Sequence, residues 1–275
     1  MATQQEKAQT FRALHEREGA FVIPNPWDIG SARLFEALGF EALATTSSGF
    51  AYSLGRRDGQ VSREEKLTHC RALCEASSLP VSADLEKCFS DDPKEAAETI
   101  ALGAEAGLVG GSIEDATGDP TKPIYDFNHA VERVAAAAQV AKSLDTPFVL
   151  TARAENFLHG RRDMNDTIRR LQAFEAAGAD VLYAPGPATL DEAREITSAL
   201  TRPVNMLVTP MKGVTVADLA QAGVKRISIG GAMMRAVIGT LVRGSRQMLD
   251  EGRFDWGADM MPTPEINELF SKWES

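Results

Sequence analysis

The sequence predicts an α/β protein, a single (β/α)8 TIM-type barrel, and three observations support this prediction. Short apolar or β-branched runs alternate with longer stretches of helical periodicity along the whole chain. Eight such pairs recur at a spacing of roughly 30 residues, which is typical of a parallel sheet. Glycine directly follows several predicted helices, as in Leu38-Gly39 and Ala177-Gly178, where a left-handed cap is common. Because closure removes both edges of such a sheet, a barrel is favoured.

The predicted strands are short, and three of them begin at a proline, where a missing N–H costs least. In chain order, strands are expected at 20–25, 41–46, 80–85, 108–114, 147–153, 180–184, 203–208 and 226–229. An open doubly wound sheet is the structural alternative. It gains no support, because the first predicted strand leads into Pro24-Asn25-Pro26-Trp27 rather than into a glycine-rich phosphate-binding turn.

The helices are predicted from apolar residues that recur at the i, i+3, i+4 spacing of one helix face. In chain order, they are expected at 29–38, 63–76, 92–106, 127–144, 166–177, 188–199, 216–222 and 232–251. A further helix at Gln4–Glu16 is expected to cover the bottom of the barrel. After a Pro262-Thr263-Pro264 break, Met261–Trp273 is expected to form a packed terminal helix or an arm onto a neighbouring subunit.

Residues 1–275 are therefore expected to form one domain, with an N-terminal helix in 1–19, the barrel in 20–251 and a C-terminal helical arm in 252–275. With 29 basic and 39 acidic side chains, the net charge is −10, which disfavours nucleic acid or an anionic membrane as a partner. The three cysteines are too few for a disulfide framework. No apolar run reaches the roughly 20 residues of a membrane span. We expect a cytoplasmic protein.

Charged side chains gather at the ends of three consecutive predicted strands, where barrel enzymes place their reacting groups. Asp84 and Glu86 end the third strand, Glu114 ends the fourth and Arg153 ends the fifth. Side chains alternate between the two faces of a strand, so Asp84 and Glu86 point the same way. If Asp84 faces the barrel axis, three carboxylates converge on one point and need a positive charge among them. Arg153 is one candidate, and a divalent cation is another. Ligands that are all oxygen suit Mg²⁺ or Mn²⁺ rather than Zn²⁺.

Five motifs together carry a resemblance to a known family. They are Asn25-Pro26-Trp27-Asp28, Ser53-Leu54-Gly55-Arg56-Arg57-Asp58, Ala83-Asp84-Leu85-Glu86, Ile113-Glu114-Asp115 and Thr151-Ala152-Arg153. Through these motifs the chain resembles the isocitrate lyase/phosphoenolpyruvate mutase superfamily. Its members are barrel enzymes that make or break C–C or P–C bonds next to a 2-oxo acid.

The resemblance implies a role for each matched residue. Asp84 would bind Mg²⁺ most directly, and Glu86 and Glu114 would hold its water molecules. Arg153 would face the anionic enolate oxygen or carboxylate of the substrate, and Asp58 would lie on a mobile loop that closes over it. The residues expected to bind the substrate are Ser48, Gly49, Phe50, Arg153 and Asn205. By resemblance to the family's tetramers, the chain is expected to form a homo-oligomer, a tetramer or a dimer.

The loop after the fourth predicted strand departs from the family pattern. The lyase branch carries Lys-Lys-Cys-Gly-His there, whereas residues 116–123 hold neither Cys nor His, so an isocitrate or 2-methylisocitrate lyase is not expected. Lys122 is the residue available for phosphonate chemistry, and no Asn lies near it. His159 is a candidate acid or base if its loop folds inward. The expected activity is a Mg²⁺-dependent lyase, decarboxylase or hydrolase that cleaves a C–C bond next to an oxaloacetate-like 2-oxo acid.

Three alternatives remain at this stage. The first is P–C bond chemistry of the phosphoenolpyruvate mutase or phosphonopyruvate hydrolase type. The second is a phosphate-binding barrel, with the backbone N–H groups of Ser228-Ile229-Gly230-Gly231 as the anion site. The third is a non-catalytic oligomeric barrel.

Overall fold

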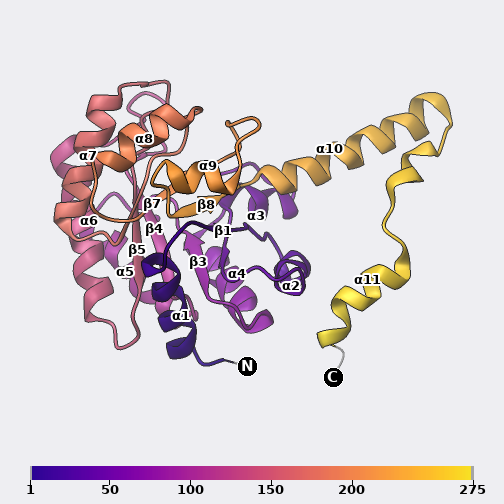
Figure 1. The fold of residues 1–275 in the computed structure, drawn as a ribbon, viewed down its shortest axis with the longest axis horizontal. Coiled ribbons are helices and arrows are strands. Elements are labelled where there is room, and N and C mark those ends of the chain that lie inside the picture. The colour runs from indigo at the N-terminus through magenta and orange to yellow at the C-terminus, as the bar shows by residue number, and fades with distance from the viewer. Residues whose placement is uncertain (1, 274–275) are drawn as a thin grey trace.

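The computed structural model describes residues 2–273, and its centre is a barrel of eight parallel strands (Figure 1). The strands are β1 (Phe21–Ile23), β2 (Leu43–Ala44), β3 (Val81–Asp84), β4 (Gly110–Glu114), β5 (Val149–Arg153), β6 (Val181–Tyr183), β7 (Val204–Leu207) and β8 (Arg226–Ser228). Their order in the sheet is β1-β8-β7-β6-β5-β4-β3-β2. Each strand lies within one of the predicted apolar runs, so the (β/α)8 prediction is confirmed and the open sheet is excluded.

Helices α2 to α9 surround this barrel, α1 covers its bottom, and the arm that holds α10 and α11 extends away from it (Figure 1). They are α1 (Gln4–Glu16), α2 (Ile29–Ala37), α3 (Ser47–Ser53), α4 (Arg63–Ala76), α5 (Pro93–Glu105), α6 (Phe127–Ser143), α7 (Met164–Ala177), α8 (Leu190–Ser198), α9 (Val216–Gln221), α10 (Ala232–Arg246) and α11 (Thr263–Phe270). Short η segments follow at Gln247–Glu251, Asp255–Asp259 and Ser271–Trp273. The helices match the predicted ones except α3, which forms where a loop was expected. No helix within residues 2–273 has the length and apolar character needed to span a bilayer.

The hydrogen bonds between neighbouring strands are distributed unevenly around the barrel. Seven neighbouring strand pairs form parallel ladders, whereas no ladder is recorded between β1 and β2 in the described part of the chain. That junction is bridged by a backbone hydrogen bond from Ala44 N to Pro24 O of 3.0 Å. The Asn25 side chain adds a bond to Thr45 O of 3.2 Å.

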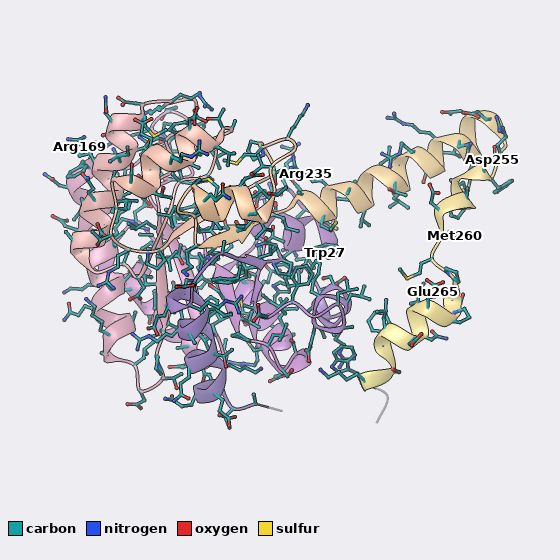
Figure 2. The ribbon with its side chains drawn as sticks, in the orientation of Figure 1. Trp27, Arg169, Arg235, Asp255, Met260 and Glu265 are labelled. Atoms are coloured by element: carbon teal, nitrogen blue, oxygen red, sulfur yellow. The ribbon has the colours of Figure 1, made fainter. Side chains whose placement is uncertain are left out.

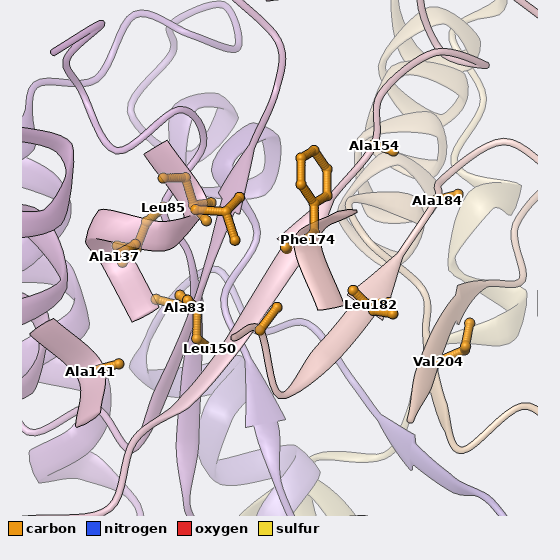
Figure 3. Close-up of a cluster of buried hydrophobic side chains, with 14 of the residues drawn as sticks. Ala83, Leu85, Ala137, Ala141, Leu150, Ala154, Phe174, Leu182, Ala184 and Val204 are labelled. Carbon is orange, nitrogen blue, oxygen red and sulfur yellow. The ribbon is translucent and has the colours of Figure 1, made fainter. Parts of the chain in front are cut away.

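Two apolar layers hold the barrel together. The larger lies between the strands and the surrounding helices, where Leu85, Leu150, Leu182 and Phe174 are buried (Figure 3). The smaller lies inside the bottom of the barrel, where α1 inserts Phe11 among inward side chains of the strands. The predicted role of the N-terminal helix as a bottom cover is therefore confirmed. The upper part of the barrel, in contrast, is lined mainly by polar residues.

The C-terminal part of the chain leaves the barrel after β8. Helix α10 extends away from the barrel, and the following segment turns back so that α11 approaches α2 (Figure 1). Side chains of this arm, among them Asp255 and Met260, stand clear of the barrel (Figure 2). At the end of the arm, Lys272 forms an ion pair of 2.5 Å with Glu36 of α2.

Candidate active site

A cavity of about 210 Å³ opens at the carboxyl ends of the strands, and all eight strands or the loops after them contribute to its lining. Five of the residues expected to act on substrate or metal line it. They are Ser48, Asp58, Asp84, Arg153 and Asn205. Its size suits a small metabolite, because pockets for drug-sized ligands begin at about 300 Å³. The other expected site residues do not line the cavity, although each lies within two residues of one that does: Gly49, Phe50, Glu86 and Glu114.

Arg153 is the centre of the charged cluster at this mouth. Its Nη1 donates to Asp84 Oδ1 at 2.8 Å, and its Nε donates to Glu155 Oε1 at 2.9 Å. Its Nη2 lies 3.5 Å from Glu114 Oε2, and its guanidinium carbon lies 5.0 Å from the centre of the Tyr183 ring. One cation thus serves three carboxylates. Glu155 was not among the predicted site residues, although strand alternation places it on the same face as Arg153.

Asp84 is held in place by backbone groups as well as by Arg153. Its Oδ2 accepts a hydrogen bond of 3.1 Å from Ser47 N at the start of α3, and its Oδ1 accepts one of 3.3 Å from Glu86 N. Burial raises the pKa of Asp84, but the charges of Arg153 and Lys66 and the bonds from Ser47 outweigh burial, so the pKa is lowered. Asp84 therefore carries a negative charge near neutral pH.

The neighbouring carboxyl groups have raised pKa values. Burial, together with the charge of Asp84, raises the pKa of Glu86 to about 7. Burial raises the pKa of Glu114 well above its usual range. The charge of Arg153 lowers this pKa, but the negative charges of Glu155, Asp84 and Glu86 act against that lowering. Burial and Asp84 also raise the pKa of Asp58 at the cavity edge. The cluster holds more acid than its own cations neutralise.

Because this cluster has more carboxyl groups than cationic side chains, we ask whether its residues fit a divalent cation. Within residues 2–273, no three His, Cys, Asp or Glu side chains are grouped as a ready-made set of metal ligands. Mg²⁺ does not need such a set, because it keeps several water molecules and binds through one or two carboxylates. Asp84 as a direct ligand, with Glu86 and Glu114 reaching the ion through water, is compatible with both observations. The donor chemistry fits Mg²⁺ or Mn²⁺.

Helix α3 places the residues predicted to cradle a carboxylate. Thr46 caps the helix, and Gly49 N donates to Thr46 Oγ1 at 3.2 Å. Phe50 N donates to Thr46 O at 3.1 Å. The amides of Gly49 and Phe50 are thus engaged in the first turn of the helix. Ser48 presents its hydroxyl at the cavity wall, where it lies 3.2 Å from Thr46 Oγ1.

The turn after β3 has an unusual backbone. Glu86, Cys88 and Phe89 adopt positive φ angles of 53°, 57° and 59°. Such conformations cost roughly 1 kcal/mol per residue for side chains other than glycine. The turn is fixed from behind by Arg133, which donates to Lys87 O and Ser90 O at 2.5 Å each. The strained turn sets the direction of Glu86.

Several groups that carry charge or close contacts here were not identified from the sequence. Lys66 of α4 is fully buried, and its Nζ has no hydrogen-bond partner among the described residues. Its charge helps to lower the pKa of Asp84 and partly opposes the rise in the pKa values of Asp58 and Glu86, so it lies close enough to act on all three. A lysine within an amphipathic helix reads as a surface residue, so no signal in the sequence singles it out.

Other candidates lie outside the cavity or are already engaged. His159 is exposed and is not part of the lining. Lys122 is exposed and pairs with Asp126 at 2.9 Å. The backbone N–H groups of Ile229 and Gly230 donate to Asn25 Oδ1 at 3.0 and 2.8 Å. These two amides are therefore occupied by Asn25 rather than available to a phosphate.

Comparisons with known proteins find relatives that match most of the chain. A family model described as phosphoenolpyruvate phosphomutase matches residues 11–249. The crystal structure of a candidate lyase/mutase from Burkholderia cenocepacia J2315 is 52% identical, covers 98% of this chain and 96% of its own, and has a TM-score of 0.94. An uncharacterized protein of Mycobacterium tuberculosis H37Rv is 32% identical over 245 residues, which are 88% of this chain and 89% of the relative. The oxaloacetate decarboxylase of Paraburkholderia xenovorans is 30% identical over 227 residues, which are 80% of this chain and 74% of that enzyme.

Proposed function

This chain belongs to the isocitrate lyase/phosphoenolpyruvate mutase superfamily, and from this membership we propose that it is a Mg²⁺-dependent enzyme that cleaves a C–C bond next to a 2-oxo acid. Lyase, decarboxylase and hydrolase outcomes all develop enolate-type negative charge when the C–C bond breaks. In decarboxylation, loss of CO₂ leaves the bonding electrons on the carbon beside the 2-oxo carbonyl, so the charge develops on the oxo oxygen. In retro-aldol or hydrolytic cleavage, the electrons are left on the carbon beside the carboxylate of the departing fragment, so the charge develops on that carboxylate. The substrate class is an oxaloacetate-like acid, in line with the similarity to an oxaloacetate decarboxylase.

The observation that carries this proposal is the cluster of Asp84, Glu114 and Glu155 around Arg153 at the cavity mouth. Asp84 would hold the metal directly, and Glu86 and Glu114 would hold its water molecules. A bound divalent cation supplies positive charge beside the oxo and carboxylate oxygens of the substrate. Arg153 adds a fixed guanidinium at the same place. Loss of one such preorganised interaction typically costs about 3 to 4 kcal/mol of the barrier.

The remaining residues bind the substrate and control access of water. Ser48 and Asn205 offer polar groups along the cavity wall. Asp58 lies in the exposed connection between α3 and α4, and its carboxyl reaches the cavity edge. We assign to this connection the role of a lid that closes over the substrate. Closure excludes water, which strengthens the charge interactions and delays protonation of the enolate.

C–C cleavage is favoured over P–C chemistry by the position of Lys122. The P–C alternative relies on this lysine to bind a phosphonate, but its ammonium pairs with Asp126 outside the cavity. The engaged amides of Ile229 and Gly230 likewise give no support to a phosphate-binding barrel.

The test is an assay of metal-free protein with oxaloacetate and a panel of 2-oxo and 2-hydroxy acids. Release of pyruvate, CO₂ or glyoxylate is measured with and without Mg²⁺ or Mn²⁺. We expect turnover of at least one acid only with the metal, and its loss again after EDTA is added. Asp84→Ala is expected to reduce turnover by about 100-fold or more, the effect of losing one major charge interaction, with the fold retained by circular dichroism.

Asp91→Ala is the matched control. Asp91 is a carboxylate of the loop that follows Asp84 and β3; it lies outside the cavity and pairs with Lys87 at 2.6 Å. Its variant is expected to keep wild-type turnover. Normal turnover by Asp84→Ala, or turnover that persists in EDTA, would falsify the assignment.

We also propose that the chain works as a homo-oligomer. Helix α10 and the segment after it expose large apolar side chains far from the barrel, among them Val237, Leu241 and Trp256. A contiguous apolar face of this kind is typical of a protein–protein contact. Its occupant in this proposal is a second copy of the chain.

A further inference from the structure

A second arginine lies deeper in the same barrel, and its partners are neutral. Arg226 is the first residue of β8 and is 5% exposed. Its Nε donates to Asn205 Oδ1 and its Nη2 donates to Thr151 Oγ1, both at 2.9 Å. Its Nη1 has no hydrogen-bond partner among residues 2–273. One N–H-bearing nitrogen of a buried guanidinium is thus left without an acceptor.

The charge of Arg226 is also uncompensated. Burial lowers the pKa of Arg226 to about 10; Tyr183 opposes this shift and the like charge of Arg153 adds to it. The three carboxylates at the mouth are already gathered around Arg153. Below Arg226, burial and the charge of Arg226 lower the pKa of His15 to about 3, so this imidazole is neutral and supplies no negative charge. A buried charge without a counter-ion costs several kcal/mol, which an anionic ligand would offset.

Arg226 faces the cavity of the candidate active site. It lines the same volume of about 210 Å³ as Asp84 and Arg153. Ser112 of β4 lines it as well, and its Oγ is the other unpartnered polar atom of this wall. Arg226 bonds to Thr151, which is the register partner of Ser112 on the next strand, so the free guanidinium N–H and the free hydroxyl lie along one wall of the cavity. The cavity has an acidic mouth and a cationic floor.

We propose that Arg226 and Ser112 form a subsite for a second carboxylate of the substrate. This inference rests on the proposed function, in which the 2-oxo carboxylate end of the substrate binds at the metal-binding mouth. The second carboxylate accepts hydrogen bonds from Arg226 Nη1 and Ser112 Oγ. The enzyme is thereby selective for dicarboxylic over monocarboxylic oxo acids.

The experiment compares two stable acids that differ only at the far end. Malate and 2-hydroxybutyrate both have four carbons and a 2-hydroxy acid group, but the first ends in a carboxylate and the second in a methyl group. Their binding to the wild-type protein is measured by calorimetry in saturating Mg²⁺. We expect malate to bind at least tenfold more tightly, since charge-assisted hydrogen bonds are among the strongest.

Variants of the subsite should remove this preference and leave the rest of binding unchanged. In Arg226→Met, the affinity for malate is expected to fall until the two acids bind within about twofold of each other, while 2-hydroxybutyrate binds as before. Ser112→Ala and Arg226→Lys should reduce the preference in part, and they test the subsite even if Arg226→Met fails to fold. Lys7→Met is the matched control, because it removes another buried cation, whose Nζ donates to Cys74 O and Ser77 O and which does not line the cavity, and it should keep the preference.

The outcomes separate this inference from the proposed function. If both acids bind with equal affinity to the wild-type protein, or if Arg226→Met and Ser112→Ala keep the preference, the subsite is excluded and the proposed function stands. In that case Nη1 is satisfied by a buried water molecule. If neither acid binds in the presence of Mg²⁺, both proposals fail. Without ligand, Arg226→Met should have a melting temperature no lower than the wild type, because an unpaired buried charge has been removed. A lower melting temperature, together with a retained preference for malate, would show that Arg226 only stabilises the fold and would overturn the inference.

Discussion

At the scale of single residues, the candidate site is governed by an imbalance of charge. Arg153 is shared among three carboxylates, and Lys66 acts on the same carboxylates although its Nζ has no hydrogen-bond partner within residues 2–273. Lys66 thus supplies part of the positive charge that a metal ion would supply. A buried lysine in this position lowers the attraction of the carboxylates for a second cation.

Lys66→Met is therefore expected to tighten Mg²⁺ binding. Methionine is similar in length and leaves the carboxylates with less compensating charge, so the dissociation constant should fall by about tenfold or more, which corresponds to about 1.4 kcal/mol. Calorimetric titration of metal-free protein with Mg²⁺ measures the change.

Lys7→Met is the control for this prediction. Lys7 is also buried, but its Nζ donates to Cys74 O at 2.9 Å and Ser77 O at 2.6 Å, away from the cavity. That variant should lose stability and keep the wild-type affinity for Mg²⁺. Equal affinities of the wild type and Lys66→Met would contradict the role assigned to Lys66.

The sequence predicts the contacts of this site only where strand periodicity applies. Alternation along the consecutive strands β3, β4 and β5 turns Asp84 and Arg153 toward the same interior, and the structure places their side chains 2.8 Å apart. Alternation also puts Glu155 on the same face as Arg153. It says nothing of Lys66, which approaches from a helix, and it does not reveal that Arg226 has no acidic partner among the residues that the structure describes. Those facts depend on how distant elements pack.

At the scale of secondary-structure elements, the junction of β8 with α10 is built against α3. A Cβ atom added to Gly231 would collide with Ser48 Oγ. The backbone of Gly231 has a φ of −75°, which any residue adopts, so its lack of a side chain matters for space and not for conformation. The close approach of the two elements fixes the position of the Ser48 hydroxyl.

Gly231→Ala is expected to displace Ser48 and weaken substrate binding. The new methyl group must push α3 away from β8, so KM should rise by about tenfold, in the range of a lost hydrogen bond, while the melting temperature changes by only a few degrees. KM is measured by steady-state kinetics with whichever acid of the assay panel the wild-type enzyme turns over.

Gly239→Ala serves as the comparison variant. Gly239 lies within α10, and a Cβ there would meet only the end of the flexible Arg243 side chain, at 3.2 Å. This change should leave KM unaltered and raise helix stability slightly, since alanine is the better helix former. An unchanged KM in Gly231→Ala would show that the Ser48 position has no influence on binding.

Helix α3 is also the element that sequence reasoning missed. It has seven residues, SSGFAYS, with Ser and Gly at its start, and such residues are typical of loops. The cap by Thr46 and the bond from Ser47 N to Asp84 stabilise it instead. The cap bond is local, whereas the bond to Asp84 forms only when β2 and β3 lie side by side. The long helices α1, α4 and α6, with clear apolar periodicity, were predicted almost to the residue.

At the scale of the whole molecule, the barrel and the C-terminal arm differ in how they bury apolar surface. The barrel encloses its apolar residues, whereas Leu241 of α10 is 68% exposed and Val237 is 50% exposed. The eight-fold repeat of the sequence predicts the barrel. The path of the arm is not encoded in that repeat, and its association with another subunit remains a prediction.

The mass in solution tests this prediction. We expect light scattering to give at least twice the 29.7 kDa of a single chain. Leu241→Glu places a charge on the exposed apolar face of α10 and should shift the protein toward the single-chain mass, because burial of an unpaired charge in a contact is costly.

Arg235→Glu is the control at this scale, since Arg235 lies at the barrel end of α10 (Figure 2), six residues before Leu241 and about 120° from it around the helix axis. It should leave the mass unchanged. A single-chain mass for the wild-type protein would remove the homo-oligomer proposal and leave the barrel chemistry untouched.

The junction between β1 and β2 has a consequence for how small molecules enter. Because Ala44 and Pro24 share one backbone bond there and Asn25 adds a single side-chain bond, this is where the ring separates with the least loss of bonding. A transient split at this junction would widen the entrance beside Asn25 without disturbing the seven ladders. Deuterium should therefore replace the amide hydrogen of Ala44 sooner than those in the centre of β4 or β5, and a bound acid should slow that replacement.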